Sequence, residues 1–463
     1  MWRSHPPDRR EGRLLFLLLA LTLVRGLIYS AVIPPWQSPD EPFHLLSAQS
    51  AILQGAPDAA DQWEQLKAET AASLCAFRFW ELAGLVVRKP ENCCPEGSDA
   101  CPSHGFGEPT QVRPRTFSHT LLSLPLRLTA DQPILWQLYQ ARLLSVLVNL
   151  AVVAIAFAVG ALLFPNDAFG RLLLPTVIVF LPQHTAIMAA VNDGNPAELW
   201  SCLAIYFWVR GIVKGFNWRK LLLVTLFTAL AALSKPTTYF LVPLLLALLI
   251  GYGWRRLHGR WRLAPIGATV MLLAGLALGS ERFRHPLALL VSLLTSDGDS
   301  LNRWRPHQLP AALFETFRSL WAFLGWNALP VDDAWIVGWL VLGVLALAGL
   351  IRLGWRYRHS RLDGDPLLIW GRVALLFGGC ILISLAIMLI IFAYSAGQYG
   401  LYQGRYLFPA IIPIVGLLVI GWREWLPAAW RRAGLIAMTS LFFVFDTAVL
   451  LAYALPFFYP VWR

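Results

Sequence analysis

Apolar stretches long enough to cross a membrane recur along almost the whole chain. The hydrocarbon core of a bilayer requires a run of about 20 mostly apolar residues per helix, and the first such run begins at residue 14. The pattern therefore predicts an all-α polytopic membrane protein. We place about 11 transmembrane helices, at residues 14–33, 137–163, 171–191, 197–213, 219–234, 239–253, 264–281, 335–351, 369–393, 407–421 and 434–455.

The expected helices at 219–234 and 239–253 are the hardest to delimit. Both are short, and the segment Ser234-Lys235-Pro236-Thr237-Thr238 separates them. Short, interrupted membrane helices can mark a binding site in membrane proteins. Lys235, in this interruption, is therefore a candidate binding residue.

Basic residues gather in the short connections between expected helices. Cytoplasmic loops of membrane proteins carry an excess of Lys and Arg, so this distribution predicts a cytoplasmic N-terminus and a C-terminus on the outer side. The basic clusters fall at residues 3–13, 210–220, 255–262, 352–361 and 423–432.

This topology leaves two long outer segments, at residues 34–135 and 281–334. We expect a cytoplasmic basic tail at 1–13 and a single transmembrane domain at 14–463 into which both segments are inserted. The first segment includes an amphipathic run at 73–87, which favours interfacial helices lying on the membrane.

Composition agrees with a membrane protein. Of the 463 residues 57% are hydrophobic and only 14% are charged, and the chain contains 21 Trp. The net charge of +11 would suit a nucleic-acid ligand, but its concentration in short loops is the positive-inside pattern. We therefore expect membrane lipids as partners and no nucleic acid.

Four of the six cysteines lie in the first outer segment, where an oxidising compartment would favour disulfide bonds. Four cysteines allow three pairings, and the sequence leaves the pairing open. A zinc site that includes His104 is the alternative, although the spacing matches no common zinc pattern. The disulfide candidates are Cys75, Cys93, Cys94 and Cys101.

Two adjacent carboxylates and a histidine follow the first expected helix, in the sequence Pro39-Asp40-Glu41-Pro42-Phe43-His44. Acidic residues beside a membrane are costly and usually functional. Asp40 could instead cap a helix whose first turn contains Pro42, and Glu41 could support the helix dipole. His44 lies one turn after Asp40 and could be a base, a ligand or an interfacial aromatic residue.

Further polar residues fall at the outer ends of later helices. Asn192-Asp193-Gly194 also has the composition of an ordinary turn. Arg405, within Gln403-Gly404-Arg405-Tyr406, begins an apolar stretch, where an arginine must reach the interface or pair with an anion. A phosphate group suits Arg405 and also Lys235, and snorkelling is the alternative for the lysine.

Other acidic motifs have simpler explanations. Two Asp-Gly-Asp triplets, at residues 297–299 and 363–365, resemble metal-binding motifs of nucleotide-sugar enzymes, but Asp-Gly is a common turn dipeptide. We interpret both as turns. The chain contains no phosphate-cradling glycine loop, so nucleotide hydrolysis has no support.

A first helix with a cytoplasmic N-terminus, followed by a long outer loop that opens with Asp40-Glu41, resembles the GT-C superfamily of membrane glycosyltransferases, and three motifs add to this resemblance. They are the residues 39–44, Asn192-Asp193-Gly194, and Gln403-Gly404-Arg405-Tyr406-Leu407-Phe408-Pro409. More narrowly, they resemble a bacterial polytopic membrane family of unknown function that is grouped with GT-C enzymes. The resemblance extends over nearly the whole chain and implies a GT-C-like fold with a long first outer loop.

The resemblance implies transfer of a sugar from a polyprenyl-phosphate donor to a lipid, glycan or other acceptor, with inversion. It also implies a site on the extracytoplasmic face of a bacterial plasma (inner) membrane, in glycan biosynthesis of the cell envelope. Asp40 becomes the candidate general base, with Glu41 beside it, and Arg405 and Lys235 would bind the donor phosphate. Residues expected to support the acceptor or a metal are His44, Asn192, Asp193, Gln403 and Tyr406.

A divalent cation, Mg²⁺ or Mn²⁺, could stabilise the leaving phosphate in place of basic side chains. Its expected ligands are Asp40 and Asp193. No cofactor is required by the motifs themselves.

Two other functions remain open from the sequence. An oligosaccharide polymerase or ligase that uses a lipid-linked glycan would depend on arginines of the second outer segment, Arg303 and Arg305. A lipid flippase or transporter would place polar residues at the membrane midplane and often contains internal repeats. Arg25, His184 and Glu198 keep this alternative open.

Overall fold

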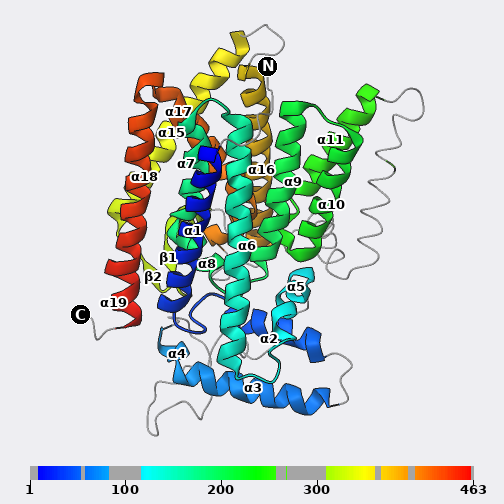
Figure 1. The fold of residues 1–463 in the computed structure, drawn as a ribbon, viewed down its shortest axis with the longest axis vertical. Coiled ribbons are helices and arrows are strands. Elements are labelled where there is room, and N and C mark those ends of the chain that lie inside the picture. Colours follow the sequence, from blue (N-terminus) through cyan, green and yellow to red (C-terminus); the bar gives the residue numbers. More distant parts are fainter. Residues whose placement is uncertain are drawn as a thin grey trace.

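The computed structural model describes residues 9–53, 58–82, 116–256, 267, 309–359, 366–394 and 402–459. These residues are mostly helical, and the long helices lie side by side in one bundle (Figure 1). The bundle helices are α1 (Arg9–Val32), α6 (Ile134–Leu163), α7 (Ala168–Val179), α8 (Pro182–Met188), α9 (Gly194–Lys214), α10 (Trp218–Ser234), α11 (Leu241–Arg256), α15 (Asp333–His359), α16 (Pro366–Tyr394), α17 (Ile411–Trp425) and α18 (Arg431–Ala448).

The fold class expected from the sequence is confirmed. Within the described residues seven helices are long and apolar enough to span a membrane, or up to eight if a bent pair counts as one span. The number of about 11 and the orientation stay predictions. The expected helices at 197–213 and 219–234 correspond to α9 and α10. The expected helix at 264–281 lies almost entirely outside the described residues.

The bent pair is α7 and α8, which meet at an angle of 59°. Pro182 occupies the first turn of α8, where a proline fits because its missing N–H would have no helical partner. The residue before a proline avoids the helical conformation, and Leu181 is extended, with φ −85° and ψ 106°. The break ends α7 in the apolar core and starts α8 in a new direction.

A second break separates α10 from α11, at the segment 234–238 where the sequence predicts it. Lys235 is extended, with φ −156° and ψ 138°, and the short 3₁₀ helix η2 (Pro236–Thr238) follows it. Pro236 cannot continue the hydrogen bonding of α10. The side chain of Lys235 therefore projects from a helix end near Asn192 and Asp193.

A layer of shorter helices covers one end of the bundle. In Figure 1 this layer lies at the lower end, with α3 running across the bundle. It has its own apolar cluster, in which Trp36, Phe43, Leu74 and Leu122 are buried. The layer consists of α2 (Glu41–Leu53), α3 (Ala59–Ala76), α4 (Phe79–Leu82) and α5 (Phe117–Leu126).

The 3₁₀ helix η6 (Gly404–Ala410) lies between α9 and α14 (Leu309–Trp321). A Cβ atom on Gly404 would lie 2.3 Å from the backbone nitrogen of Leu320, so only glycine permits this approach. The backbone N–H of Gly404 also donates to the Ser319 hydroxyl, at 2.8 Å. The remaining elements are β1 (Phe323–Leu324) and β2 (Leu329–Pro330), which pair antiparallel, η7 (Ala428–Trp430), the π-helical turn Val449–Ala454 and α19 (Leu455–Phe458).

The opposite end of the bundle is held by ion pairs. Arg423 at the end of α17 contacts Asp167 at 2.5 Å, and Arg431 contacts the same carboxylate at 3.1 Å. The start of α1 and the connections α6–α7, α9–α10 and α17–α18 also lie at this upper end of Figure 1. The described basic connections therefore gather at the end remote from α2 to α5.

Candidate active site

Asp40 lies directly before α2, in an uncommon backbone conformation. Its φ is +65°, in the left-handed region that non-glycine residues seldom adopt. An ordinary helix cap has an extended backbone, so Asp40 precedes the helix without the usual capping geometry. Its carboxylate contacts Arg405 instead, at 2.7 Å from Oδ2 to Nη2, and Arg405 also donates to the Pro39 carbonyl at 3.2 Å.

Glu41 has a different environment from Asp40. It is completely buried and accepts two hydrogen bonds from Arg142 of α6, at 2.8 and 2.7 Å. The backbone N–H groups of Trp36 and Val191 also donate to it, at 3.0 and 3.1 Å. Four donors thus engage the two carboxylate oxygens, and the arrangement suits a structural anchor better than the catalytic role expected beside Asp40.

The turn Asn192-Asp193 meets Lys235. Asp193 Oδ1 lies 2.5 Å from Lys235 Nζ, and Asn192 Oδ1 accepts from the same ammonium at 3.2 Å and from the N–H of Gly194 at 2.8 Å. The Ser118 hydroxyl of α5 donates to the Asp193 carbonyl at 2.7 Å. The turn is therefore fixed both by the bundle and by the covering layer.

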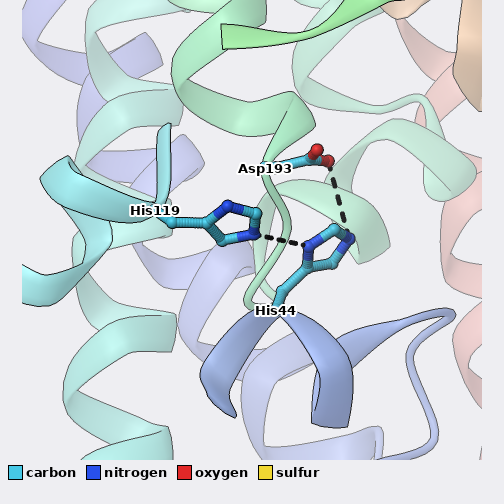
Figure 2. A group of neighbouring side chains, drawn as sticks. All are labelled: His44, His119 and Asp193. Atoms are coloured by element: carbon cyan, nitrogen blue, oxygen red, sulfur yellow. Dashed lines mark hydrogen bonds and ion pairs between the residues drawn. The ribbon is translucent and has the colours of Figure 1, made fainter. Parts of the chain in front are cut away.

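Two histidines join this turn to α2. His44 Nδ1 lies 3.0 Å from His119 Nε2, and His44 Nε2 lies 3.5 Å from Asp193 Oδ1. Figure 2 shows the three side chains converging from α2, α5 and the turn before α9, with dashed lines from His44 to both of the others. His44 thus bridges His119 and Asp193 with its two different ring nitrogens.

The protonation states follow from burial and neighbouring charge. Burial lowers the pKa of His44 to about 3, and the nearby Asp193 only partly opposes this effect. Burial alone would raise the pKa of Asp193, but Lys235, followed by His44 and His119, brings it below its usual range. At neutral pH the site therefore contains a neutral His44 and an ionised Asp193.

The hydrogen bonds also select the tautomers. The backbone N–H of Thr116 donates to His119 Nδ1 at 2.9 Å, so a neutral His119 carries its proton on Nε2 and donates to His44 Nδ1. His44 then carries its proton on Nε2, facing Asp193. Donation thus runs from Thr116 through His119 to His44, and the Nε2 proton of His44 lies on the side of the Asp193 carboxylate, 3.5 Å away.

The donor set does not fit a divalent cation. His44, His119 and Asp193 are the metal-binding group that the described residues bring together, with their ligand atoms within 4.8 Å of one another, but His44 contacts its two partners with different nitrogens. His119 Nδ1 accepts a hydrogen bond, which keeps a proton on the nitrogen that would bind the metal. Of the expected ligands, Asp40 and Asp193 are each already paired with a basic side chain.

Both basic side chains of these pairs line one small pocket. Lys235 and Arg405 contribute to its wall, together with Asn192, Asn195 and Glu198. The carboxylates of Asp40 and Asp193 pair with these two cations, at 2.7 and 2.5 Å. Lys235 and Arg405, although each is paired with a carboxylate, are the side chains of this pocket suited to bind an anion such as a phosphate.

The remaining residues expected from the sequence either form no hydrogen bond with Lys235 or lie outside the described residues. The Arg405 guanidinium lies 5.3 Å from the centre of the Tyr406 ring, and Gln403 is buried directly before η6. Cys75 is in a disulfide bond, while the buried Cys202 and Cys380 are free. The residues Cys93, Cys94, Cys101, His104, Arg303 and Arg305 and both Asp-Gly-Asp triplets lie outside the described residues.

Sequence reasoning missed two residues that organise the site. Arg142 could have been noticed, because a lone arginine within an apolar helix requires a buried partner. His119 gave no such signal, since a histidine near a short polar stretch has many ordinary roles. The polar residues His184 and Glu198, expected only under the transporter alternative, form a buried pair at 2.6 Å.

Comparison with known families agrees with the motifs. Residues 136–278 match the family model described as dolichyl-phosphate-mannose-protein mannosyltransferase, which belongs to the GT-C superfamily. The match bears out the predicted resemblance to that superfamily over 143 of the 463 residues and agrees with a membrane glycosyltransferase of that type. The resemblance of the rest of the chain and the narrower bacterial family stay predictions. The matched segment carries Asn192, Asp193 and Lys235, but not Asp40 or Arg405. No curated protein matches the chain.

Proposed function

We propose that this chain transfers a sugar from a polyprenyl-phosphate donor to a lipid, glycan or other acceptor on the outer face of a bacterial plasma membrane. One observation carries the proposal. Asp40 and Arg405, separated by 365 positions in the sequence, meet at 2.7 Å beside a pocket that Arg405 lines together with Lys235. A base and a phosphate-binding pair are thus held within one site.

The reaction assigns one step to each group. Asp40 accepts the proton of the acceptor hydroxyl while that oxygen forms a bond to the anomeric carbon of the donor. The bond from that carbon to the phosphate oxygen breaks at the same time, and its electron pair leaves with the lipid phosphate. Attack opposite the leaving group inverts the anomeric configuration. The cations of Lys235 and Arg405 stabilise the charge that develops on the phosphate.

The supporting residues keep these groups in place before the donor arrives. Glu41 and Arg142 anchor the start of α2, and the left-handed backbone of Asp40 turns its side chain toward Arg405. His119 and His44 orient Asp193, which in turn holds Lys235. Preorganised charges of this kind need little rearrangement during the reaction.

Transfer from labelled polyprenyl-phosphate hexoses by the purified protein tests the proposal. We expect Asp40→Asn to reduce the rate about 100- to 10,000-fold, as the loss of a general base does. We expect Arg405→Gln to reduce it about 100- to 1,000-fold, as the loss of one charge-stabilising group does. Asp61→Asn, at an exposed position of α3, is the matched control.

Full activity of Asp40→Asn would contradict the catalytic assignment. Absence of transfer from every such donor, with the wild-type protein folded and lipid movement retained, would favour a flippase instead.

A further inference from the structure

The pocket beside Arg405 and Lys235 contains polar groups that the proposed reaction does not use. Its wall includes Asn195 and Glu198 of α9, Thr237 of η2 and Phe408 of η6. Asn195 and Glu198 are three residues apart on α9, which places them on one face of the helix. Only 1% of Asn195 and 2% of Glu198 is exposed.

Glu198 is a carboxylate with one oxygen engaged. Its Oε1 lies 2.6 Å from His184 Nε2, and within the described part of the chain Oε2 has no hydrogen-bond partner. His184 is fully buried, and its ring lies against Phe408 in an edge-to-face contact with the centroids 5.2 Å apart. The contact with His184 therefore fixes the Glu198 carboxylate at the pocket wall, and Oε2 can accept a further hydrogen bond.

Asn195 is oriented in the same way. Its amide nitrogen donates to the carbonyls of Ile187 and Ala190, at 3.1 and 2.9 Å, which turns the amide oxygen away from them. That oxygen is buried and has no partner within the described structure, and the same holds for the Thr237 hydroxyl and Arg405 Nε. Buried polar atoms are costly unless they form hydrogen bonds, so these atoms at the wall of one pocket suit polar groups of a ligand.

The charge pattern shows which part of a ligand would lie where. A phosphate is attracted by Lys235 and Arg405 but repelled by the carboxylate of Glu198. Neutral hydroxyl groups suit Glu198 and Asn195, because carboxylate and amide oxygens accept hydrogen bonds from them. The aromatic ring of Phe408 offers an apolar surface to the C–H groups of a sugar ring.

We propose that Asn195 and Glu198 form a subsite that binds hydroxyl groups of the donor sugar, with His184 as the positioning residue for Glu198. This inference rests on the proposed function, because it takes the phosphate of the same donor to lie at Arg405 and Lys235. It assigns donor selectivity to the buried end of α9. The alternative is that the His184–Glu198 contact only stabilises the packing of α8 against α9.

Binding measurements with two ligands separate these explanations. The probes are a polyprenyl phosphate without sugar and the tightest binder among polyprenyl-phosphate hexoses of the same chain length. We expect Glu198→Gln and Asn195→Ser to weaken binding of the hexose donor about 10- to 100-fold, with binding of the sugar-free phosphate unchanged. Ser201→Ala, a buried position of α9 outside the pocket lining, should change neither.

The proposed function and the proposed sugar subsite would be contradicted by different results. If the wild-type protein binds neither probe, the proposed function is wrong. If it binds both and the variants weaken both equally, or leave discrimination among hexoses unchanged, the subsite is wrong while the proposed function stands. Asn195→Ser leaves the His184–Glu198 pair intact, so it keeps the test decisive if Glu198→Gln fails to fold.

His184 has its own test. His184→Gln places an amide donor where His184 Nε2 lies, whereas His184→Leu removes the donor. We expect His184→Leu to weaken binding of the hexose donor as Glu198→Gln does, and His184→Gln to restore most of it. Equal losses in both His184 variants, with equal losses for the sugar-free phosphate, would reduce His184 to a packing residue.

Discussion

At the scale of single residues, His44 links protonation to stability. Its pKa in the folded protein is about 3, compared with an ordinary value of 6.5, so the unfolded chain binds a proton first as the pH falls. The free energy of unfolding should therefore decrease from about pH 6.5 downward, by up to about 1.4 kcal/mol per pH unit from this group. Thermal unfolding in detergent between pH 7.5 and 5 measures the slope.

His44→Gln cannot bind that proton, so its unfolding temperature should depend less steeply on pH in the same range. Asp193, whose folded pKa is also lowered, affects stability only below its ordinary pKa of 3.8 and does not interfere above pH 5. Parallel slopes in the two proteins would show that His44 is not buried in its neutral form.

The two neighbouring carboxylates should separate activity from stability. Removing one partner of a buried ion pair typically costs about 3–5 kcal/mol, so Glu41→Gln should lower the unfolding temperature strongly. Asp40→Asn should lower the transfer rate with a smaller loss of stability than Glu41→Gln, because 15% of the Asp40 side chain is exposed, whereas Glu41 is fully buried and accepts from four donors. Thermal melts and transfer rates of both variants test this division, and equal melts would remove the structural assignment of Glu41.

At the scale of elements, the position of η6 determines where Arg405 lies. Gly404→Ala places a Cβ against the backbone of Ser319 and Leu320, which cannot yield as a side chain could. We expect η6 to shift, and binding of polyprenyl phosphate and sugar transfer to fall about tenfold or more, since small misplacements in a site are costly. Gly343→Ala in α15, where nothing lies within 4 Å of the added atom, is the control and should be neutral.

The sequence could predict the positions of the helices better than the contacts between residues far apart in the chain. Hydrophobic runs located most of the long helices, and the segment around Pro236 located the break between α10 and α11, because these depend on local chemistry. The break at Pro182 was not predicted, since residues 171–191 were expected to form one continuous helix. The partner of Asp40 was not predictable, since Arg405 reaches it only through the packing of η6 against α14. His119 likewise enters the site through the placement of α5 on the bundle, which no local pattern encodes.

At the scale of the whole molecule, polar groups divide between the two ends of the bundle. One end carries the ion pairs of Asp167 with Arg423 and Arg431, and the other carries Asp40, Asp193 and the covering helices. Basic connections face the cytoplasm in membrane proteins. This division therefore favours a site on the outer face, where a lipid-linked sugar and its acceptor would meet.

Labelling of single introduced cysteines tests this orientation. Gln62→Cys on α3 and Arg219→Cys at the start of α10 both lie at exposed positions, at opposite ends of the bundle. We expect a membrane-impermeant maleimide to label Gln62→Cys in intact cells and Arg219→Cys only after permeabilisation, with the unsubstituted protein as background. The native Cys202 and Cys380 are buried and should add little. The orientation is inferred from the basic connections alone. The reverse labelling pattern would overturn it, place the site on the cytoplasmic face and require a donor presented there.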